Sequence, residues 1–158
     1  IRVTSAPGQG STFRIYLPEA APASDPAGDR PAITGPERGA ETVLLVEDAP
    51  GVRTATREIL ERHGYTVLEA QTGHAALGIA VSHVGPIHLL LTDVVMAEMS
   101  GRELADQFTT LRPETRVLYV SGYADDVVFQ RGVITYLRKP FSSEALTRKV
   151  REVLDNRE

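Results

Sequence analysis

The chain has 158 residues, of which 42% are hydrophobic and 24% charged, the proportions of a soluble globular protein with room for one ordinary domain and an appendage. The formal net charge of −4 argues against a nucleic-acid-binding surface, and the absence of cysteine excludes disulfides and thiolate metal sites. No apolar stretch approaches the roughly 18 residues of a membrane span, so we expect no membrane contact by this chain and a cytoplasmic location. Because the sequence opens on Ile1 rather than Met, we also expect it to be part of a longer polypeptide.

Residues 1–17 are predicted to end in a β-strand. A glycine-rich turn precedes residues 12–17, in which Phe13, Ile15 and Leu17 alternate onto one face. One strand without a partner or a core cannot form a domain, so a tag or flexible arm is one interpretation.

Residues 18–41 change in composition to Ala, Pro, Gly and Asp, with prolines at positions 18, 22, 26, 31 and 36. Such a segment buries too little apolar surface to offset its ordering entropy. The composition therefore predicts a flexible linker and a domain boundary.

From residue 42 onward, apolar runs typical of strands alternate with segments of helical periodicity. The predicted strands are 42–46, 66–70, 87–92, 116–120 and 134–138. The predicted helices are about 50–62, 72–84, 101–111, a short one within 121–132, and one capped by Ser142 that runs to about 154. This alternation favours an α/β fold, a flavodoxin-like doubly wound five-stranded parallel sheet of order 2-1-3-4-5 with five helices, over residues 42–158.

Acidic residues follow two of the predicted strands. Asp93 follows the third strand, and Glu47 and Asp48 follow the first, which the predicted order places beside the third. Their carboxylates are expected to meet at the switch point of the sheet. Alone, Asp93 could simply begin a turn, and the group could be a surface acidic cluster. Mg²⁺ is the alternative, since it prefers one or two carboxylates, backbone oxygens and waters.

A hydroxyl and a cation follow two other strands. Ser121 closes the fourth strand and could be a turn residue or a donor to a phosphoryl oxygen. Lys139 closes the fifth, where it is either solvated or paired with Asp93. Its bond to Pro140 is of a type that is usually trans, although a cis bond would help turn Lys139 inward.

With these residues in place, residues 42–158 resemble a receiver domain of two-component signalling. The matching segments are VLLVEDAPGVR, LLLTDVVMAEMSG, YVSGY and YLRKPF, in the family's order. The resemblance implies that Asp93 is the phosphoacceptor and that Lys139 contacts the phosphoryl group. It also implies that Ser121 and Tyr136 form the conformational switch. The implied Mg²⁺ ligands are Glu47 through water, Asp48, Asp93 and the backbone carbonyl of Val95.

The segment SAPGQGSTFRIYLP resembles the end of the ATP-binding domain of sensor histidine kinases. Residues 1–17 would then be the remnant of that domain, without its nucleotide-binding elements, and the parent a hybrid sensor histidine kinase. The implied partner is a phosphohistidine of a histidine-kinase or histidine-phosphotransfer domain. A homodimer through the face of the fourth helix, fifth strand and fifth helix is a further expectation.

Other functions stay open at this point. The chain could be a phosphate-sink receiver or a pseudo-receiver that only binds partners. A phosphatase of the haloacid dehalogenase type is disfavoured, because its second Asp is replaced by Val95. A flavodoxin-like cofactor binder is disfavoured, because Glu47 and Asp48 stand where a phosphate-binding loop would lie.

Two departures from the family pattern carry expectations of their own. Ala97 stands where the family commonly has proline, which predicts a looser loop after Asp93. Val95 and Tyr123 offer no carboxylate or amide that could orient a hydrolytic water, so we expect a long-lived phosphoryl group.

Overall fold

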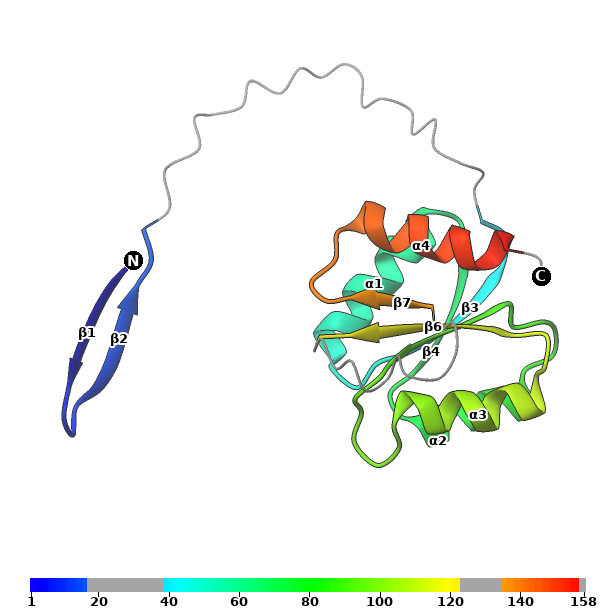
Figure 1. Ribbon diagram of the computed structural model, residues 1–158, viewed down its shortest axis with the longest axis horizontal. Coiled ribbons are helices and arrows are strands. Elements are labelled where there is room, and N and C mark those ends of the chain that lie inside the picture. The colour runs from blue at the N-terminus through cyan, green and yellow to red at the C-terminus, as the bar shows by residue number, and fades with distance from the viewer. Residues whose placement is uncertain (17–38, 123–134, 157–158) are drawn as a thin grey trace, which may run out of the picture. The chain divides into compact units, whose positions relative to one another are not determined.

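The computed structural model describes residues 1–16, 39–122 and 135–156, and the chain divides into two units, Ile1–Pro36 and Glu37–Glu158 (Figure 1). Within the first unit, β1 (Arg2–Ala6) and β2 (Gly10–Arg14) pair as an antiparallel hairpin. The sequence predicted a strand here, beginning two residues later than β2, but no partner. Its partner β1 was missed because RVTSA contains a single large apolar residue.

The second unit contains a five-stranded parallel sheet with the order β4-β3-β5-β6-β7, in which each strand pairs in parallel with its neighbours. Its strands are β3 (Thr42–Val46), β4 (Thr66–Ala70), β5 (Leu89–Asp93), β6 (Arg116–Ser121) and β7 (Tyr136–Arg138). Counted within this unit, the order is 2-1-3-4-5, so the predicted flavodoxin-like topology is confirmed. The third strand differs slightly from the prediction, because it begins two residues later and includes Asp93.

Four helices accompany this sheet in the described part of the chain: α1 (Pro50–Arg62), α2 (Gly73–Ser82), α3 (Gly101–Leu111) and α4 (Ser143–Asp155). Hydroxyl side chains begin three of them, as Thr72, Ser100 and Ser142 accept backbone N–H groups of the first turn. Another predicted helix, within 121–132, falls largely on residues 123–134, which lie outside the described residues.

The sheet separates two apolar layers, and alternation along β3 assigns its side chains to them. Val43 and Leu45 pack in a layer with residues of α1 and α4, whereas Leu44 and Val46 pack with α2 and α3 (Figure 1). These four side chains are at most 3% exposed. Burial on both faces explains why the strand is a continuous apolar run rather than an alternating one.

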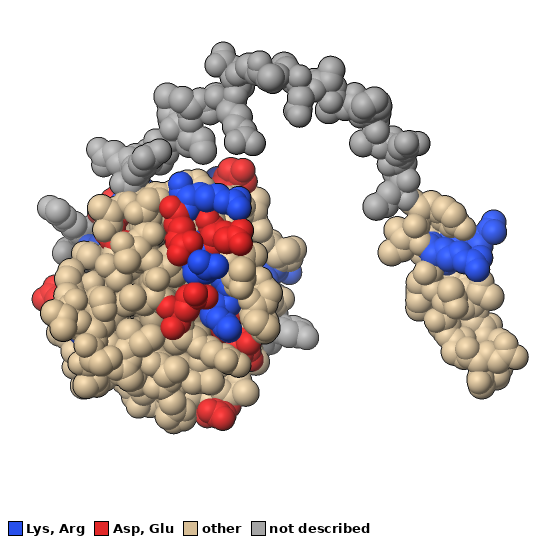
Figure 2. All heavy atoms as spheres, turned by 180° about the vertical axis from the view of Figure 1, so that it is seen from behind, with Lys and Arg blue, Asp and Glu red and all other residues tan. Residues whose placement is uncertain are grey.

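The surface of the second unit carries mixed charges. Figure 2 shows acidic and basic side chains lying next to one another in a band, and no extended basic patch on the face shown. In the described part of the chain, no helix has the length and apolar character needed to cross a membrane.

Candidate functional site

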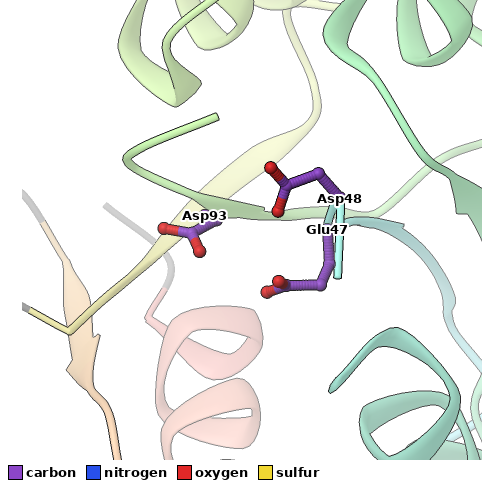
Figure 3. Close-up of side chains that lie close together, drawn as sticks. All are labelled: Glu47, Asp48 and Asp93. Atoms are coloured by element: carbon purple, nitrogen blue, oxygen red, sulfur yellow. The ribbon is translucent and has the colours of Figure 1, made fainter. Parts of the chain in front are cut away.

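The three predicted acidic residues lie together at the carboxyl edge of the sheet. Glu47 and Asp48 follow β3, and Asp93 is the last residue of the neighbouring β5. One carboxylate oxygen of each lies within 4.8 Å of the others, and Figure 3 shows the three side chains side by side. The convergence expected from the strand order is therefore present.

Lys139 joins two of these carboxylates. Its Nζ donates to Glu47 Oε2 at 2.6 Å and to Asp93 Oδ2 at 2.7 Å. Burial alone would lower the pKa of Lys139, but the hydrogen bonds and charges of Asp93 and Glu47 outweigh it and raise the pKa above its ordinary value. The ammonium therefore stays charged beside Asp93. The peptide bond between Lys139 and Pro140 is cis, the less common of the two forms considered.

Glu47 and Asp48 differ in how far the fold engages them. Glu47 is 5% exposed, and besides its bond to Lys139 it accepts the backbone N–H of Ala49 through Oε1 at 3.4 Å. Asp48 is exposed and makes no hydrogen bond or ion pair with the rest of the described chain. Asp48 is thus the carboxylate most available to a cation, whereas Glu47 would have to act at longer range or through water.

The backbone around Asp93 is closely packed. The buried Thr92 hydroxyl donates to the Asp93 carbonyl at 3.0 Å, and the Val95 N–H donates to Asp93 Oδ1 at 3.1 Å. At the first residue of α3, a Cβ on Gly101 would lie 2.0 Å from the Asp93 carbonyl oxygen. Only glycine allows the helix to begin this close to the Asp93 peptide. The role of the Val95 carbonyl as a metal ligand stays a prediction.

The two residues expected to form the switch lie on adjacent strands. Ser121 ends β6 and is 7% exposed, and its carbonyl accepts the Lys139 N–H at 2.7 Å. Tyr136 begins β7 opposite Tyr119 and is 44% exposed. The structure thus links Ser121 to Lys139 through the backbone and leaves Tyr136 at the surface.

The donor set suits a hard divalent cation. All three acidic side chains offer oxygen, the ligand atom that Mg²⁺ prefers, and opposite ligands of a bound Mg²⁺ lie about 4.2 Å apart. Oxygens within 4.8 Å of one another can meet such an ion with a small inward shift or through waters. One ammonium, that of Lys139, offsets three carboxylates, so the cluster also has negative charge to spare. The residues present therefore fit Mg²⁺.

The sequence did not predict the parts played by Arg53 and Gly101. Arg53 Nη1 donates to the Glu47 carbonyl at 2.6 Å. In the sequence Arg53 is only one polar residue on an amphipathic helix, and Gly101 is only a residue at a helix start. The signal that could have pointed to them is their closeness along the chain to Glu47 and Asp93.

Comparison with known protein families decides the classification. The model of the response regulator receiver domain matches residues 43–151 of this chain. The chain belongs to this family. The match confirms the resemblance seen in the sequence.

Two curated relatives are sensor kinases. The chain is 35% identical to the sensor kinase CckA of Brucella abortus (strain 2308), over 96% of this chain and 17% of that protein. It is 31% identical to the aerobic respiration control sensor protein ArcB of Escherichia coli (strain K12), over 100% of this chain and 21% of that protein. The chain thus spans about a fifth of the length of these relatives.

Solved receiver domains share the fold of the second unit. The receiver domain from the hybrid histidine kinase CckA is 33% identical, with a TM-score of 0.63, covering 72% of this chain and 99% of that one. A CheY-like receiver domain protein from Methanospirillum hungatei JF-1 is 32% identical, with a TM-score of 0.65, covering 73% of this chain and 94% of that one.

Proposed function

We propose that this receiver domain takes a phosphoryl group from a phosphohistidine onto Asp93, with Mg²⁺ bound by Asp48, Asp93 and the Val95 carbonyl, and by Glu47 through water. The observation that carries the proposal is the shared ammonium of Lys139, 2.7 Å from Asp93 and 2.6 Å from Glu47, beside the unpaired Asp48. This arrangement leaves two carboxylates held by one cation and a third, Asp48, available for a metal.

In the proposed reaction an Asp93 carboxylate oxygen attacks the phosphorus of the phosphohistidine. The new P–O bond forms as the P–N bond breaks, and the imidazole leaves as the neutral base after taking up a proton. Lys139 already donates a hydrogen bond to Asp93 and can donate instead to an oxygen of the incoming phosphoryl group. The N–H of Val95 holds the other carboxylate oxygen of Asp93. Mg²⁺, when bound, would neutralise charge on the phosphoryl oxygens.

Intact mass measurement after incubation with acetyl phosphate and Mg²⁺ tests the acceptor. We expect the wild-type chain to gain one phosphoryl mass, and Asp93→Asn to gain none. Asp106→Asn is the matched control, because Asp106 is an exposed aspartate of α3 and its loss should change nothing. No gain by the wild type, or equal gain by Asp93→Asn, would contradict the proposal and favour a pseudo-receiver.

We further propose that the phosphorylated state is transmitted through Ser121 and Tyr136 to the face of β7 and α4. Ser121 is buried at a strand end that is hydrogen-bonded to Lys139, and Tyr136 is partly exposed on the next strand, so each is placed for such a change. The expected homodimer would use the same face. Its other component, the predicted helix within 121–132, lies largely outside the described residues.

We infer a hybrid sensor histidine kinase as the parent protein, with residues 1–17 as the remnant of its ATP-binding domain, 18–41 as linker and 42–158 as receiver. Gly39 and Glu41, at the end of this linker, already contact the receiver, at Tyr65 and Arg151 respectively. The similarity to ArcB covers 100% of the chain and so includes the hairpin, and that to CckA covers 96%. Tethering would raise the local concentration of the receiver near the phosphohistidine, and the transfer would be cytoplasmic.

The hairpin supports the assignment of residues 1–17 to a larger domain, because its apolar side chains have no core of their own to pack in. Val3 and Phe13 face each other across β1 and β2 but are 53% and 67% exposed, and isolated two-stranded hairpins are marginally stable. Hydrogen exchange on this chain should therefore show weak protection in the hairpin and strong protection in β3 and β5. Equal protection in both would contradict the assignment of residues 1–17 to a larger domain.

The phosphoryl group is proposed to be long-lived. The Val95 side chain is 62% exposed and apolar, so it offers nothing to orient a water toward Asp93. Tyr123, the other residue expected to matter, lies outside the described residues. The double substitution Val95→Asn with Tyr123→Glu should speed phosphate loss, and an unchanged rate would refute the idea.

A further inference from the structure

The fold holds Glu47 in place at its backbone as well as at its carboxylate. Its N–H donates to the Ala70 carbonyl at 3.2 Å, and its own carbonyl accepts from Arg53 Nη1 at 2.6 Å. Its two carboxylate oxygens accept from Ala49 and Lys139. Among the residues that the structure describes, Arg53 is the only one outside the loop between β3 and α1 whose side chain hydrogen-bonds to the backbone of that loop.

Arg53 is itself fixed between three elements. It projects from the first turn of α1, and its Nε lies 3.6 Å from Glu69 Oε1 on β4. Its side chain is 17% exposed. A guanidinium has planar donors in a fixed arrangement, so it can bind a carbonyl with one nitrogen and a carboxylate with another. Arg53 therefore connects the loop that carries Glu47 and Asp48 to both α1 and β4.

We infer that Arg53 is a positioning residue for Mg²⁺ binding, acting through the backbone of Glu47 to hold the adjacent Asp48 in place for the metal. The inference rests on the proposed function, since it assumes that Asp48 is a ligand. Groups that orient metal ligands typically change metal affinity by about 10- to 100-fold when removed. Arg53 touches the backbone beside the ligand rather than the ligand itself, so the lower end of that range applies.

The sign of the effect separates positioning from simple electrostatics. A guanidinium near three carboxylates repels a divalent cation, so as a mere charge its removal would tighten Mg²⁺ binding. As a positioning residue its removal frees the loop and weakens binding. The two roles therefore predict opposite changes in the Kd for Mg²⁺.

Arg57 provides the matched control on the same helix. It lies four residues later, and its Nε is 3.3 Å from Glu69 Oε2, so it shares the acidic partner of Arg53. It also pairs with Glu61 at 3.2 Å. No hydrogen bond in the described chain links Arg57 to Glu47. Arg57→Met thus removes the same charge and a contact with Glu69, but leaves the Glu47 carbonyl bound by Arg53.

The experiment is calorimetric titration of the whole chain with MgCl₂ at low ionic strength. We expect the Kd to rise about tenfold for Arg53→Met and to stay within about twofold of wild type for Arg57→Met, a change of about 0.4 kcal/mol at most. Arg53→Lys keeps the charge but loses the planar fork, so it should also weaken binding. Thermal unfolding in EDTA checks that all variants fold.

A second measurement uses the rate of phosphorylation by acetyl phosphate as Mg²⁺ is varied. Positioning predicts that Arg53→Met needs more Mg²⁺ to reach half of its maximal rate, with the maximal rate itself nearly unchanged. A Kd for Arg53→Met that equals or falls below that of Arg57→Met would overturn the inference while leaving the proposed function intact. Failure of the wild type to bind Mg²⁺ at all would overturn both.

Discussion

Two clusters of charged side chains lie at opposite ends of β3, and each pairs one cation with two carboxylates. At the carboxyl end, Lys139 Nζ lies 2.6 Å from Glu47 and 2.7 Å from Asp93. At the amino end, Arg151 Nη2 lies 2.7 Å from Glu41 and 2.8 Å from Asp155 Oδ1. In each cluster one cation serves two carboxylates, so pairing alone does not distinguish a functional site from a structural one.

The clusters differ in the charge that remains and in exposure. Among the described residues, only the carboxyl-end cluster contains a third carboxylate, Asp48, within 4.8 Å. Its paired carboxylates are also more enclosed, since the side chains of Glu47 and Asp93 are 6% and 14% exposed, whereas those of Glu41 and Asp155 are 24% and 62% exposed. Surplus negative charge in a partly enclosed place favours a bound cation, whereas the two carboxylates of the amino-end cluster are offset by Arg151 and by the solvent around Asp155.

The largest effect should come from removing the cation of each cluster. Lys139→Met leaves Glu47 and Asp93 unpaired at low exposure, so it should lower the free energy of unfolding by about 2–4 kcal/mol without Mg²⁺. Saturating Mg²⁺ should restore part of the loss. Arg151→Met should cost about 1 kcal/mol, because Asp155 stays solvated, and Mg²⁺ should not change that cost. Urea denaturation with and without Mg²⁺ measures both.

The same experiment can refute the comparison. If Mg²⁺ raised the free energy of unfolding of neither the wild type nor the Lys139 variant, the carboxyl-end cluster would have no affinity for the ion. Phosphorylation by acetyl phosphate provides a second test, since it should be strongly reduced in Lys139→Met and normal in Arg151→Met.

The sequence was sufficient to predict the sheet and the site's carboxylates. The strands are short and rich in apolar or β-branched residues, and helical segments alternate with them. This alternation led to the 2-1-3-4-5 order, which the structure confirms. That order placed the residue at the carboxyl end of β5 beside those that follow β3. Strand position therefore predicted that Asp93 would meet Glu47 and Asp48.

Side-chain partners between distant elements could not be predicted in this way. Lys139 was expected to meet Asp93, but not to be shared with Glu47, which is 92 residues away. The bond between Arg151 and Glu41 spans 110 residues. Such contacts depend on the side-chain rotamer that the surrounding packing allows. The periodicity of a helix or strand predicts which face a residue lies on, but not its rotamer. The Arg53 contact escaped prediction for the same reason.

A closely packed glycine lies at each end of the sheet, so that substituting it tests the two ends separately. A Cβ on Gly101 would lie 2.0 Å from the Asp93 carbonyl oxygen, and one on Gly39 would lie 2.1 Å from Tyr65 Cε1. Gly101→Ala must shift backbone at the site, and Gly39→Ala must shift a ring at the amino end, so each should cost about 1–3 kcal/mol. Only Gly101→Ala should also raise the Kd for Mg²⁺ and slow phosphorylation.

Gly78 is the control for these glycines. It lies within α2, and a Cβ there would meet nothing within 4 Å. Gly78→Ala should therefore stabilise the domain by about 0.5–1 kcal/mol without changing Mg²⁺ binding. Thermal unfolding and Mg²⁺ titration of the three alanine variants separate the outcomes. If Gly39→Ala impaired Mg²⁺ binding as much as Gly101→Ala, the two ends would not be independent.

The smallest expected effect is on the pH dependence of stability. The amino-end cluster should lose its stabilising contribution at low pH, and the carboxyl-end cluster at high pH. The hydrogen bond from Arg151 lowers the pKa of Glu41 below its ordinary 4.5, so this stabilisation is present above that value and is lost as pH falls through the folded-state pKa. The pKa of Lys139 is raised above 10.5 because its carboxylate partners outweigh burial, so its contribution is complete below that value and is lost as pH rises through the folded-state pKa.

Urea unfolding across a pH series, without Mg²⁺, tests this opposition. Near neutral pH the free energy of unfolding of wild type should exceed that of Glu41→Gln by about 0.5 kcal/mol, a small value because the pair is partly solvated. This difference should shrink in acid. The wild-type advantage over Lys139→Met should instead shrink in alkali. Glu41 precedes β3 and Glu47 follows it. One strand would then join an ion pair that weakens in acid to a site whose ion pairs weaken in alkali. A Glu41→Gln difference that persisted in acid would show that the amino-end cluster contributes through packing rather than through its charge.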